Sequence, residues 1–230
     1  MTFKLFNPIL VGAGLGERVM RSVGAVLGIA LTIAICTLLA VGGPDLPLIV
    51  APIGASAVLV FAVPASPLAQ PWPVVGGNTL STLVGVAAYR LIPDATLAAG
   101  VAVGVAILVM SLLRCLHPPG GAAALTAVIA GESVHAAGYA FAFAPVALNS
   151  ILLVALGIAF HRLTGHSYPH RAPAVAASVA AASLHPEDID AALAEMHEEF
   201  DISREDLDAL LTLAQRHALD RQAPRAAPAR

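Results

Sequence analysis

The sequence predicts an all-α polytopic membrane protein that continues into a small cytosolic helical hairpin. Two observations support this fold class. Hydrophobic residues make up 58% of the 230 residues and charged residues only 12%, which is far from the composition of a soluble domain. The charges also divide: residues 1–165 hold six basic and four acidic side chains, whereas residues 166–230 hold six basic and eleven acidic ones. We therefore expect a transmembrane domain at 1–165, a linker at 166–183, a cytosolic helical hairpin at 184–220 and a disordered tail at 221–230.

Six apolar segments define the helices of the transmembrane domain. They cover residues 19–41, 46–63, 74–92, 97–116, 118–130 and 138–163. A helix that crosses a ~30 Å hydrocarbon core needs roughly 20 residues, so the first, third, fourth and sixth segments are long enough to cross. The second is interrupted by Pro52, and the fifth would make only about 20 Å of helix. These two short segments are predicted to be half-helices.

The two halves of the domain, roughly 19–92 and 97–163, match each other in sequence. Leu27-Gly28-Ile29-Ala30 pairs with Val103-Gly104-Val105-Ala106, Ala51-Pro52-Ile53-Gly54-Ala55 with Pro118-Pro119-Gly120-Gly121-Ala122, and Gly85-Val86-Ala87 with Gly157-Ile158-Ala159. Each half then consists of a long helix, a half-helix and a long helix. Repeats interrupted at corresponding places by a short segment rich in glycine and proline indicate a transport site at the interface between the halves.

Basic residues flank the outer ends of the domain and predict its orientation. Arg18 and Arg21 precede the first helix and Arg162 follows the last, so both termini should face the cytoplasm and the number of crossings should be even. If the half-helices dip in and return, four helices cross and the halves are parallel. If they cross, six segments cross and the halves are inverted. We favour four crossings because only Arg114 then lies outside.

The stretch from 112 to 125, LLRCLHPPGGAAAL, carries the strongest chemical signal. Arginine at membrane depth is costly, and irregular backbone is tolerated there only against protein or a water-filled cavity. Arg114 and His117 are therefore expected to face inward and to bind the substrate. The open alternative is that Arg114 is an interfacial anchor and the prolines form a tight turn.

Prolines and glycines give this stretch its predicted shape. Pro118 cannot extend the fourth helix, whereas Pro119 suits the first turn of a new one. Gly120 and Gly121 allow another backbone or a ligand to approach closely, so we include both among the substrate-binding residues. Free N–H groups at the start of this helix, beside a cation and an imidazole, would favour an anion.

Two further polar residues complete the predicted site. Ser56 lies one turn into the second segment, after Pro52, and is the repeat partner of the end that carries His117. Asn78 opens the third helix with Ser81 and Thr82 on or near one face. Hydrogen bonding between helices is the alternative role for these side chains.

The residues from 15 to 165 resemble the HPP family of integral membrane proteins. The likeness is carried by His117-Pro118-Pro119-Gly120-Gly121 after Arg114-Cys115, by 51–57, by 61–71 and by Val75-Gly76-Gly77-Asn78. The resemblance implies four membrane-spanning helices, and a plastid and cyanobacterial branch of the family is implicated in nitrite transport. Many relatives are expected to have histidine where this chain has Asn78, which weakens a proton-coupled mechanism relying on that position.

Other classes of function find little support in the sequence. The only acidic residues between the first and last apolar segments are Asp45, Asp94 and Glu132, all in predicted loops, so we expect no enzyme. Histidine and cysteine spacings fit no metal site, and we predict no metal and no cofactor. The single lysine and the low charge argue against a nucleic acid as partner.

The residues after 184 predict two amphipathic helices. Ile189, Leu193, Met196 and Phe200 recur at helical spacing, and Ser203 with Asp206 resembles a capping box. Two short helices are marginal alone, so their apolar face needs the other helix, a second subunit or a cytosolic protein partner.

Together these features predict a membrane transporter or channel-like permease for a small inorganic anion, with nitrite as the candidate that the resemblance implies. The alternative is a non-transporting membrane scaffold or sensor whose cytosolic hairpin binds a partner. Either protein would be multi-pass, embedded in the lipid bilayer of a bacterial inner membrane, with both termini cytoplasmic. A homo-oligomer is also expected.

Overall fold

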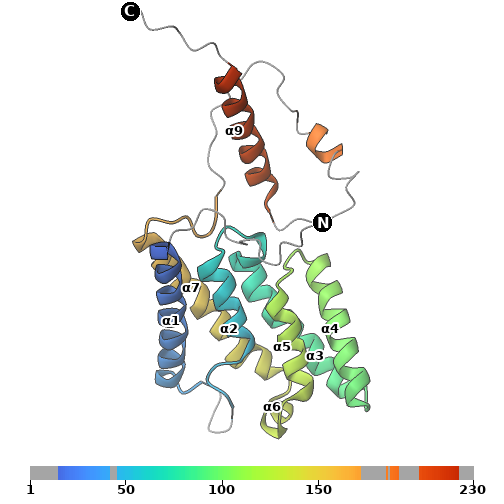
Figure 1. Cartoon of the computed structure of the whole chain (residues 1–230). Coiled ribbons are helices and arrows are strands. Elements are labelled where there is room, and N and C mark those ends of the chain that lie inside the picture. Colours follow the sequence, from blue (N-terminus) through green and yellow to red (C-terminus); the bar gives the residue numbers. More distant parts are fainter. Residues whose placement is uncertain (1–14, 42–45, 172–184, 186, 192–201, 223–230) are drawn as a thin grey trace, which may run out of the picture. The chain divides into compact units, whose positions relative to one another are not determined.

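The computed structural model describes residues 15–41, 46–171, 185, 187–191 and 202–222. It divides into a membrane unit, Met1–Pro169, and a C-terminal unit, His170–Arg230. The membrane unit thus ends four residues beyond the predicted boundary at 165. The residues described form helices and turns without a strand, which confirms the all-α fold class (Figure 1).

The membrane unit contains helices of very different lengths. In chain order they are α1 (Leu15–Leu38), α2 (Pro52–Ala57), η1 (Val58–Ala62), η2 (Pro67–Ala69), η3 (Pro73–Gly77), α3 (Asn78–Leu91), α4 (Ala95–Leu112), α5 (Pro118–Ile129), α6 (Glu132–Ala137), η4 (Ala142–Ala147) and α7 (Leu148–Leu163). The segments η1, η3 and η4 are π-helical and run directly into or out of an α-helix. Each half therefore has a long helix, a short one and a long one.

Prolines begin both short helices. Pro52 lies at the start of α2 and Pro118 at the start of α5, where a missing N–H costs nothing and a fixed φ favours the helix. His117, before Pro118, has an extended backbone with φ −144° and ψ 106°, as a residue before proline prefers. The proline pattern alone thus accounts for where the short helices start.

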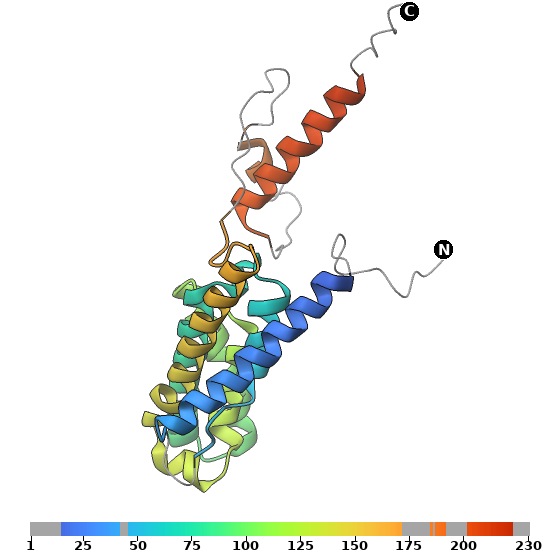
Figure 2. The same cartoon turned by 90° about the vertical axis from the view of Figure 1, so that its left-hand side faces the viewer.

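Neighbouring segments of the first half run in opposite directions (Figure 2). The guanidinium of Arg21, near the start of α1, donates to the carbonyl of Ala62 at the end of η1, at 2.8 Å. At the other end, Asn149 donates to Cys36 in α1 at 3.2 Å and accepts from the N–H of Val50, just before α2, at 3.2 Å. The segment Pro52–Ala62 is therefore antiparallel to α1.

The second half repeats this alternation. A Cβ on Gly85 of α3 would meet the carbonyl of Ala124 in α5, and Tyr89 at the end of α3 stacks on His135, which follows α5. The helices α3 and α5 therefore run in the same direction. Met110 at the end of α4 lies against Gly77 at the start of α3, so α4 runs the opposite way.

These contacts correct the preference for parallel halves. Six segments alternate in direction, and Arg90 lies at the end of the unit opposite to Arg21 and Arg114. The expectation failed because Pro52–Ala62 and α5, although short, each lead from one end of the unit toward the other instead of returning. The halves are antiparallel, which was the other arrangement left open by the sequence.

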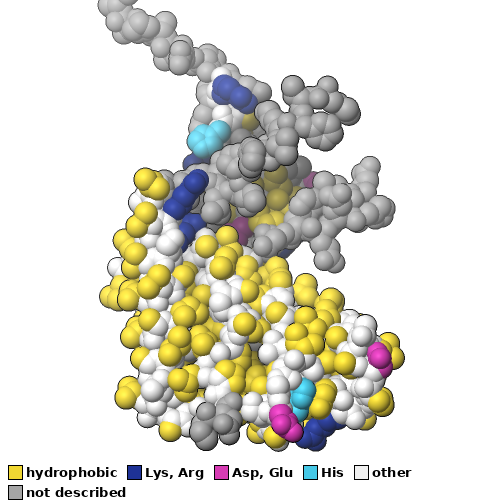
Figure 3. Space-filling view, turned by 60° about the horizontal axis from the view of Figure 1, so that its bottom comes forward, with side chains coloured by type: hydrophobic (Ala, Val, Ile, Leu, Met, Phe, Trp, Pro, Cys, Tyr) yellow, Lys and Arg dark blue, Asp and Glu magenta, His cyan; other side chains and the backbone are white. Residues whose placement is uncertain are grey.

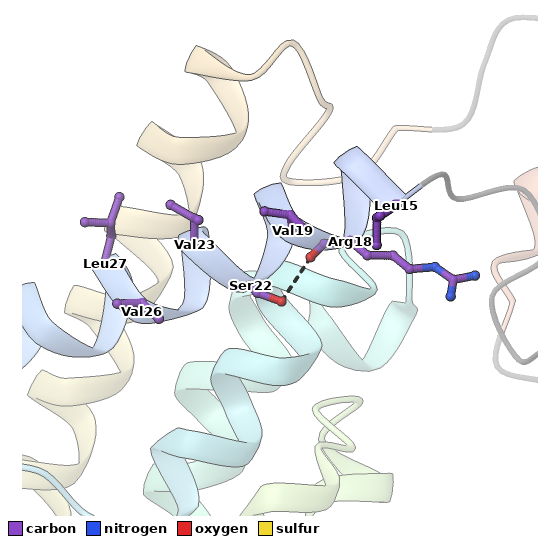
Figure 4. A pocket seen from close by; sticks show the side chains of 7 residues that line it. All are labelled: Leu15, Arg18, Val19, Ser22, Val23, Val26 and Leu27. Atoms are coloured by element: carbon purple, nitrogen blue, oxygen red, sulfur yellow. Dashed lines mark hydrogen bonds between the residues drawn. The ribbon is translucent and has the colours of Figure 1, made fainter.

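The surface of the membrane unit is suited to lipid. By length and hydropathy, three helices among the described residues are candidate membrane spans, Leu15–Leu38, Ala95–Leu112 and Ala142–Leu163. Hydrophobic side chains cover much of the face shown in Figure 3. A groove of about 480 Å³ runs along α1 and is lined by Leu15, Arg18, Val19, Ser22, Val23, Val26 and Leu27 (Figure 4).

The C-terminal unit is described mainly by α9 (Arg204–Gln222). Ser203 caps this helix, since its hydroxyl accepts from the N–H of Asp206 at 3.0 Å and donates to the carboxylate of Asp206 at 2.5 Å. Residues 187–191 are helical, whereas the predicted apolar positions Leu193, Met196 and Phe200 lie outside the described residues. Because α9 reaches Gln222, the predicted tail at 221–230 begins with two helical residues.

Candidate functional site

Three of the predicted site residues, from three separate segments, meet in one buried cluster. Ser56 comes from α2, Asn78 from the start of α3 and His117 from the residue before α5, and all three are fully buried. The Ser56 hydroxyl lies 2.8 Å from Nε2 of His117. The amide nitrogen of Asn78 donates to the same hydroxyl at 3.0 Å. Together with Ser150, described next, these three residues form what we name the central polar cluster.

The fourth member, Ser150 of α7, was missed by the sequence analysis. The Asn78 amide nitrogen also donates to the Ser150 hydroxyl at 3.2 Å, and that hydroxyl donates to the carbonyl of Val146 at 2.9 Å. A signal was available: Gly85 and Gly157 differ by 72 residues, and the same offset carries Asn78 onto Ser150. Side chains at equivalent positions of the two halves thus form a hydrogen bond with each other.

The other ring nitrogen of His117 is held by the backbone. Nδ1 lies 2.8 Å from the carbonyl oxygen of Leu68, in the short helix η2. The next carbonyl, of Ala69, accepts from the hydroxyl of Tyr168 at 2.8 Å. Burial raises the pKa of Tyr168, so this phenol stays protonated and keeps the η2 segment in place.

Close approaches of glycine backbone let α3, α4 and α5 meet around the cluster. A Cβ on Gly77 would lie 2.6 Å from Cβ of His117, and one on Gly120 would lie 2.8 Å from the Ser81 hydroxyl and 2.9 Å from the carbonyl of Gly77. Only glycine fits at either position. Gly121, in contrast, lies near Val103 without crowding. Of the two predicted glycines, Gly120 borders the cluster and Gly121 does not.

Two buried polar atoms at the cluster have no hydrogen-bond partner among the described residues. They are the side-chain oxygen of Asn78 and the hydroxyl of Ser81, one turn apart on α3. Leaving such an atom unpaired in a buried place costs about 1–3 kcal/mol. These two atoms are the part of the cluster whose hydrogen-bonding capacity the described residues leave unused.

The N-terminus of α5 contributes less than the sequence predicted. Pro118 and Pro119 have no N–H, and the N–H of Gly120 donates to the carbonyl of His117 at 2.8 Å. The expected row of free N–H groups is therefore replaced by two prolines and a closed turn. Pro52 at the start of α2 acts in the same way, with Ile53 and Gly54 donating to the carbonyls of Val50 and Ala51.

Arg114 lies outside the central polar cluster. Its side chain is exposed and its backbone has a positive φ of 53°, at the turn after α4. Trp72 supports this turn by donating its indole N–H to the carbonyl of Leu113 at 3.1 Å. The expectation that Arg114 faces inward is therefore wrong for the single chain, because the turn that ends α4 directs it away from the cluster.

A second buried amide, Asn149, was also missed and has a structural role. It donates to the carbonyl of Leu48 at 3.0 Å and accepts from the N–H of Val50 at 3.2 Å. These bonds satisfy the irregular backbone that leads into α2. No charged side chain takes part in either polar group, and the described residues contain no cluster of histidine, cysteine and acidic side chains that could hold a metal ion.

Comparison with known proteins places the membrane unit in a family. Residues 12–169 match the family described as the HPP transmembrane region. Two proteins of Dictyostelium discoideum named only as transmembrane proteins are similar. One is 36% identical over 120 residues, which cover 50% of this chain and 42% of the relative. The other is 40% identical over 104 residues, 44% of this chain and 33% of the relative. The chain thus matches less than half the length of these relatives. No solved structure matches it.

Proposed function

The chain belongs to the HPP transmembrane region family, and from this membership and the central polar cluster we propose that it is a permease for a small inorganic anion. Nitrite is the first candidate, because the resemblance to this family implies it. The substrate would bind at the central polar cluster, between the two antiparallel halves. Ser56, Asn78, His117 and Ser81 are the side chains assigned to it.

One observation carries this proposal: the cluster is buried, polar and built from both halves. Asn78 lies six residues along the helix from Trp72, or about 9 Å at 1.5 Å per residue, and Ser150 is hydrogen-bonded to it. This distance corresponds to the interior of a ~30 Å hydrocarbon core. An ionisable side chain such as His117 is expensive at such a depth and marks a candidate functional site by default.

The architecture around the cluster supports the same function. Short helices opened by proline lie at corresponding places in the two halves, and the halves run in opposite directions. Inverted repeats with interrupted helices and a midplane site are the common plan of secondary transporters. The π-helical segment η3 begins at Pro73, and η4 contains Pro145. These two prolines are again 72 residues apart. Such π-segments are frequent at functional sites.

The test is uptake by the purified full chain in proteoliposomes, with nitrite, nitrate, formate, chloride and sulfate compared. Ser81→Ala is the sharpest variant, because it removes a buried hydroxyl without a partner. We expect its thermal stability to equal or exceed that of the wild type, while nitrite uptake falls by about tenfold, or ~1.4 kcal/mol. Loss of uptake without loss of stability is not expected from a residue that only packs.

A matched control is Thr37→Val, which removes an exposed hydroxyl that bonds only within its own helix, to the carbonyl of Ile33. Uptake by this variant should stay within about twofold of the wild type, since such a surface change is worth less than ~0.5 kcal/mol. If the wild type carries none of the anions, the permease is refuted and the membrane scaffold takes its place.

A further inference from the structure

The hydrogen bonds of the central polar cluster form one continuous chain. It runs from the carbonyl of Leu68 through both nitrogens of His117 to the hydroxyl of Ser56 and the amide of Asn78, at 2.8, 2.8 and 3.0 Å. The carbonyl at one end can only accept, so Nδ1 of His117 must carry a proton. The hydroxyl of Ser56 then has two acceptors within reach, Nε2 of a neutral His117 at 2.8 Å and the carbonyl of Pro52 at 3.2 Å.

With a neutral His117, the chain leaves only an acceptor for a ligand. Nε2 then accepts the single proton of the Ser56 hydroxyl, and that oxygen accepts an N–H of Asn78. The other N–H of Asn78 goes to Ser150, whose own proton goes to the carbonyl of Val146. The Asn78 oxygen remains without a partner among the described residues. An anion finds no amide donor here.

With a protonated His117, the same side chains present donors. Both ring nitrogens now donate, so Ser56 accepts from Nε2 and its own proton turns away from the ring, either to the carbonyl of Pro52 at 3.2 Å or to Asn78. When an anion binds, the amide can turn over, so that its two N–H groups face the side where the oxygen had no partner. Its oxygen then accepts from Ser56 and Ser150, whose protons leave the carbonyls of Pro52 and Val146. Ser81 adds a hydroxyl donor one turn away. The position now suits a small anion and lies beside a positive imidazolium.

Few other charged groups lie near enough to His117 to compensate the charge of a bound anion in place of this proton. The titratable side chains next to His117 along the chain are the buried Cys115 and the exposed Arg114, and Tyr168 bonds to Ala69 beside Leu68. The helices of the cluster carry others only at their far ends: Tyr89 and Arg90 on α3, and His161 and Arg162 on α7. No acidic or basic side chain hydrogen-bonds to the central polar cluster within the described ranges. An anion alone would therefore be a buried, uncompensated charge, whereas an anion with one proton on His117 is neutral as a pair.

We propose that the central polar cluster binds a small monovalent oxyanion together with one proton, held on His117, and that the two cross the membrane as an electroneutral pair. The inference rests on the proposed function and adds the coupling ion and its stoichiometry. It places the proton at His117, whereas the resemblance gave reason to look for it at position 78, which is Asn78 here. Ser56 is the positioning residue that passes the protonation state of His117 on to Asn78.

The experiment uses the full chain in proteoliposomes that contain a pH-sensitive dye, with nitrite as the probe. Membrane potential is set with potassium and valinomycin, and protein-free vesicles give the baseline for diffusion of nitrous acid. We expect one proton to enter per nitrite and uptake to follow an inward proton gradient. A potential of 100 mV should leave accumulation unchanged, whereas carriage of one net charge would change it about fifty-fold.

Variants locate the proton. His117→Gln cannot be protonated, so its remaining uptake should be independent of the proton gradient and should leave the lumen pH unchanged. If that variant does not fold, Ser56→Ala keeps the imidazole but interrupts the chain to Asn78, and the same loss of coupling is expected. The control is His135→Gln, because His135 lies at the other end of the unit, stacked on Tyr89, and should retain one proton per anion.

The possible failures are distinguishable. Uptake that follows the membrane potential without acidifying the lumen overturns the proton coupling and leaves the anion permease standing. One proton per anion in both His117→Gln and Ser56→Ala refutes the assignment to His117. Absence of uptake for every anion at every gradient refutes the proposed function, and the coupling with it.

Discussion

At the scale of single residues, the site depends on uncharged groups. Ser56, Asn78, His117 and Ser150 come from four separate segments of the chain, yet each has a partner inside the cluster. In a low-dielectric interior such a network is stable only if nearly every group is paired. The two unpaired atoms, on Asn78 and Ser81, are therefore the informative exceptions.

Arg114 gives the clearest prediction at this scale. Because its side chain is exposed and lies outside the central polar cluster, Arg114→Gln should leave nitrite affinity within about threefold of the wild type, or less than ~1 kcal/mol. The rate of uptake at low salt should fall more than the affinity, since a surface cation acts by attracting the anion before it binds.

Comparison of uptake at low and high salt checks this role. Arg114→Lys keeps the charge and should behave as the wild type in both conditions. A complete loss of nitrite binding in Arg114→Gln, with the protein still folded, would show that the arginine reaches the substrate after all.

At the scale of helices, small residues decide how closely the segments pack. A Cβ on Gly85 would lie 2.3 Å from the carbonyl oxygen of Ala124, so α3 and α5 touch backbone to backbone. Helix association in lipid has little hydrophobic driving force and relies on such contacts. The alanines Ala88, Ala98, Ala102, Ala106 and Ala124 continue this packing between α3, α4 and α5.

Gly85→Ala should therefore destabilise the membrane unit strongly, since backbone cannot yield as a flexible side chain can. We expect a loss of about 1–3 kcal/mol, measured as a lower midpoint of thermal unfolding in detergent. Gly100→Ala is the matched control, because nothing lies within 4 Å of a Cβ at that position of α4. Equal stability of the two variants would contradict the close crossing of α3 and α5.

The start of α9 predicts a dependence on pH. Burial opposes ionisation of Asp206, but hydrogen bonds from Ser203 and His170 and the charge of His170 outweigh it and lower the pKa below its ordinary value of 3.8. A carboxyl whose pKa is lowered by folding stabilises the folded state, and this stabilisation is complete above about pH 4. It is lost as the pH falls through the lowered pKa.

Hydrogen exchange of the α9 backbone in the full chain measures this effect. Protection at neutral pH should fall about fivefold in Asp206→Asn, corresponding to ~1 kcal/mol for a weakened cap. Its difference from the wild type should vanish in acid. Glu205→Gln, on the exposed side of the same turn, is the control. A pH dependence that survives in Asp206→Asn would assign it to another group.

At the scale of the whole membrane unit, the antiparallel halves determine where charges lie. Arg18, Arg21, Arg114 and Arg162 gather at one end, and Arg90 lies at the other with Asp94 and Glu132. Arg90 is held there by the ring of Tyr139, 5.0 Å from the centre of its guanidinium. An excess of arginine on one side marks the cytoplasmic face of a membrane protein. With six crossings only Arg90 lies on the opposite side, so this arrangement fits the arginine distribution as well as the arrangement with four crossings, which left only Arg114 there.

Labelling of introduced cysteines tests this topology. In a variant without Cys36 and Cys115, Thr96→Cys should react from the side opposite to Ser167→Cys, and Leu113→Cys from the same side as Ser167→Cys. All three positions are exposed. Reaction of positions 96 and 167 from one side would mean that the halves are parallel, contrary to the contacts of α5 and of Pro52–Ala62.

The sequence by itself determined the helical class, the short segments opened by Pro52 and Pro118, the repeat of the two halves and three members of the central polar cluster. These follow from apolar length, proline chemistry and residue spacing, which act locally along the chain. Only the tertiary structure decided that the halves are antiparallel, that Ser150 joins Asn78 and that Arg114 points away. Each of these depends on which way a segment leads after a turn, and that is decided by packing between residues far apart in sequence.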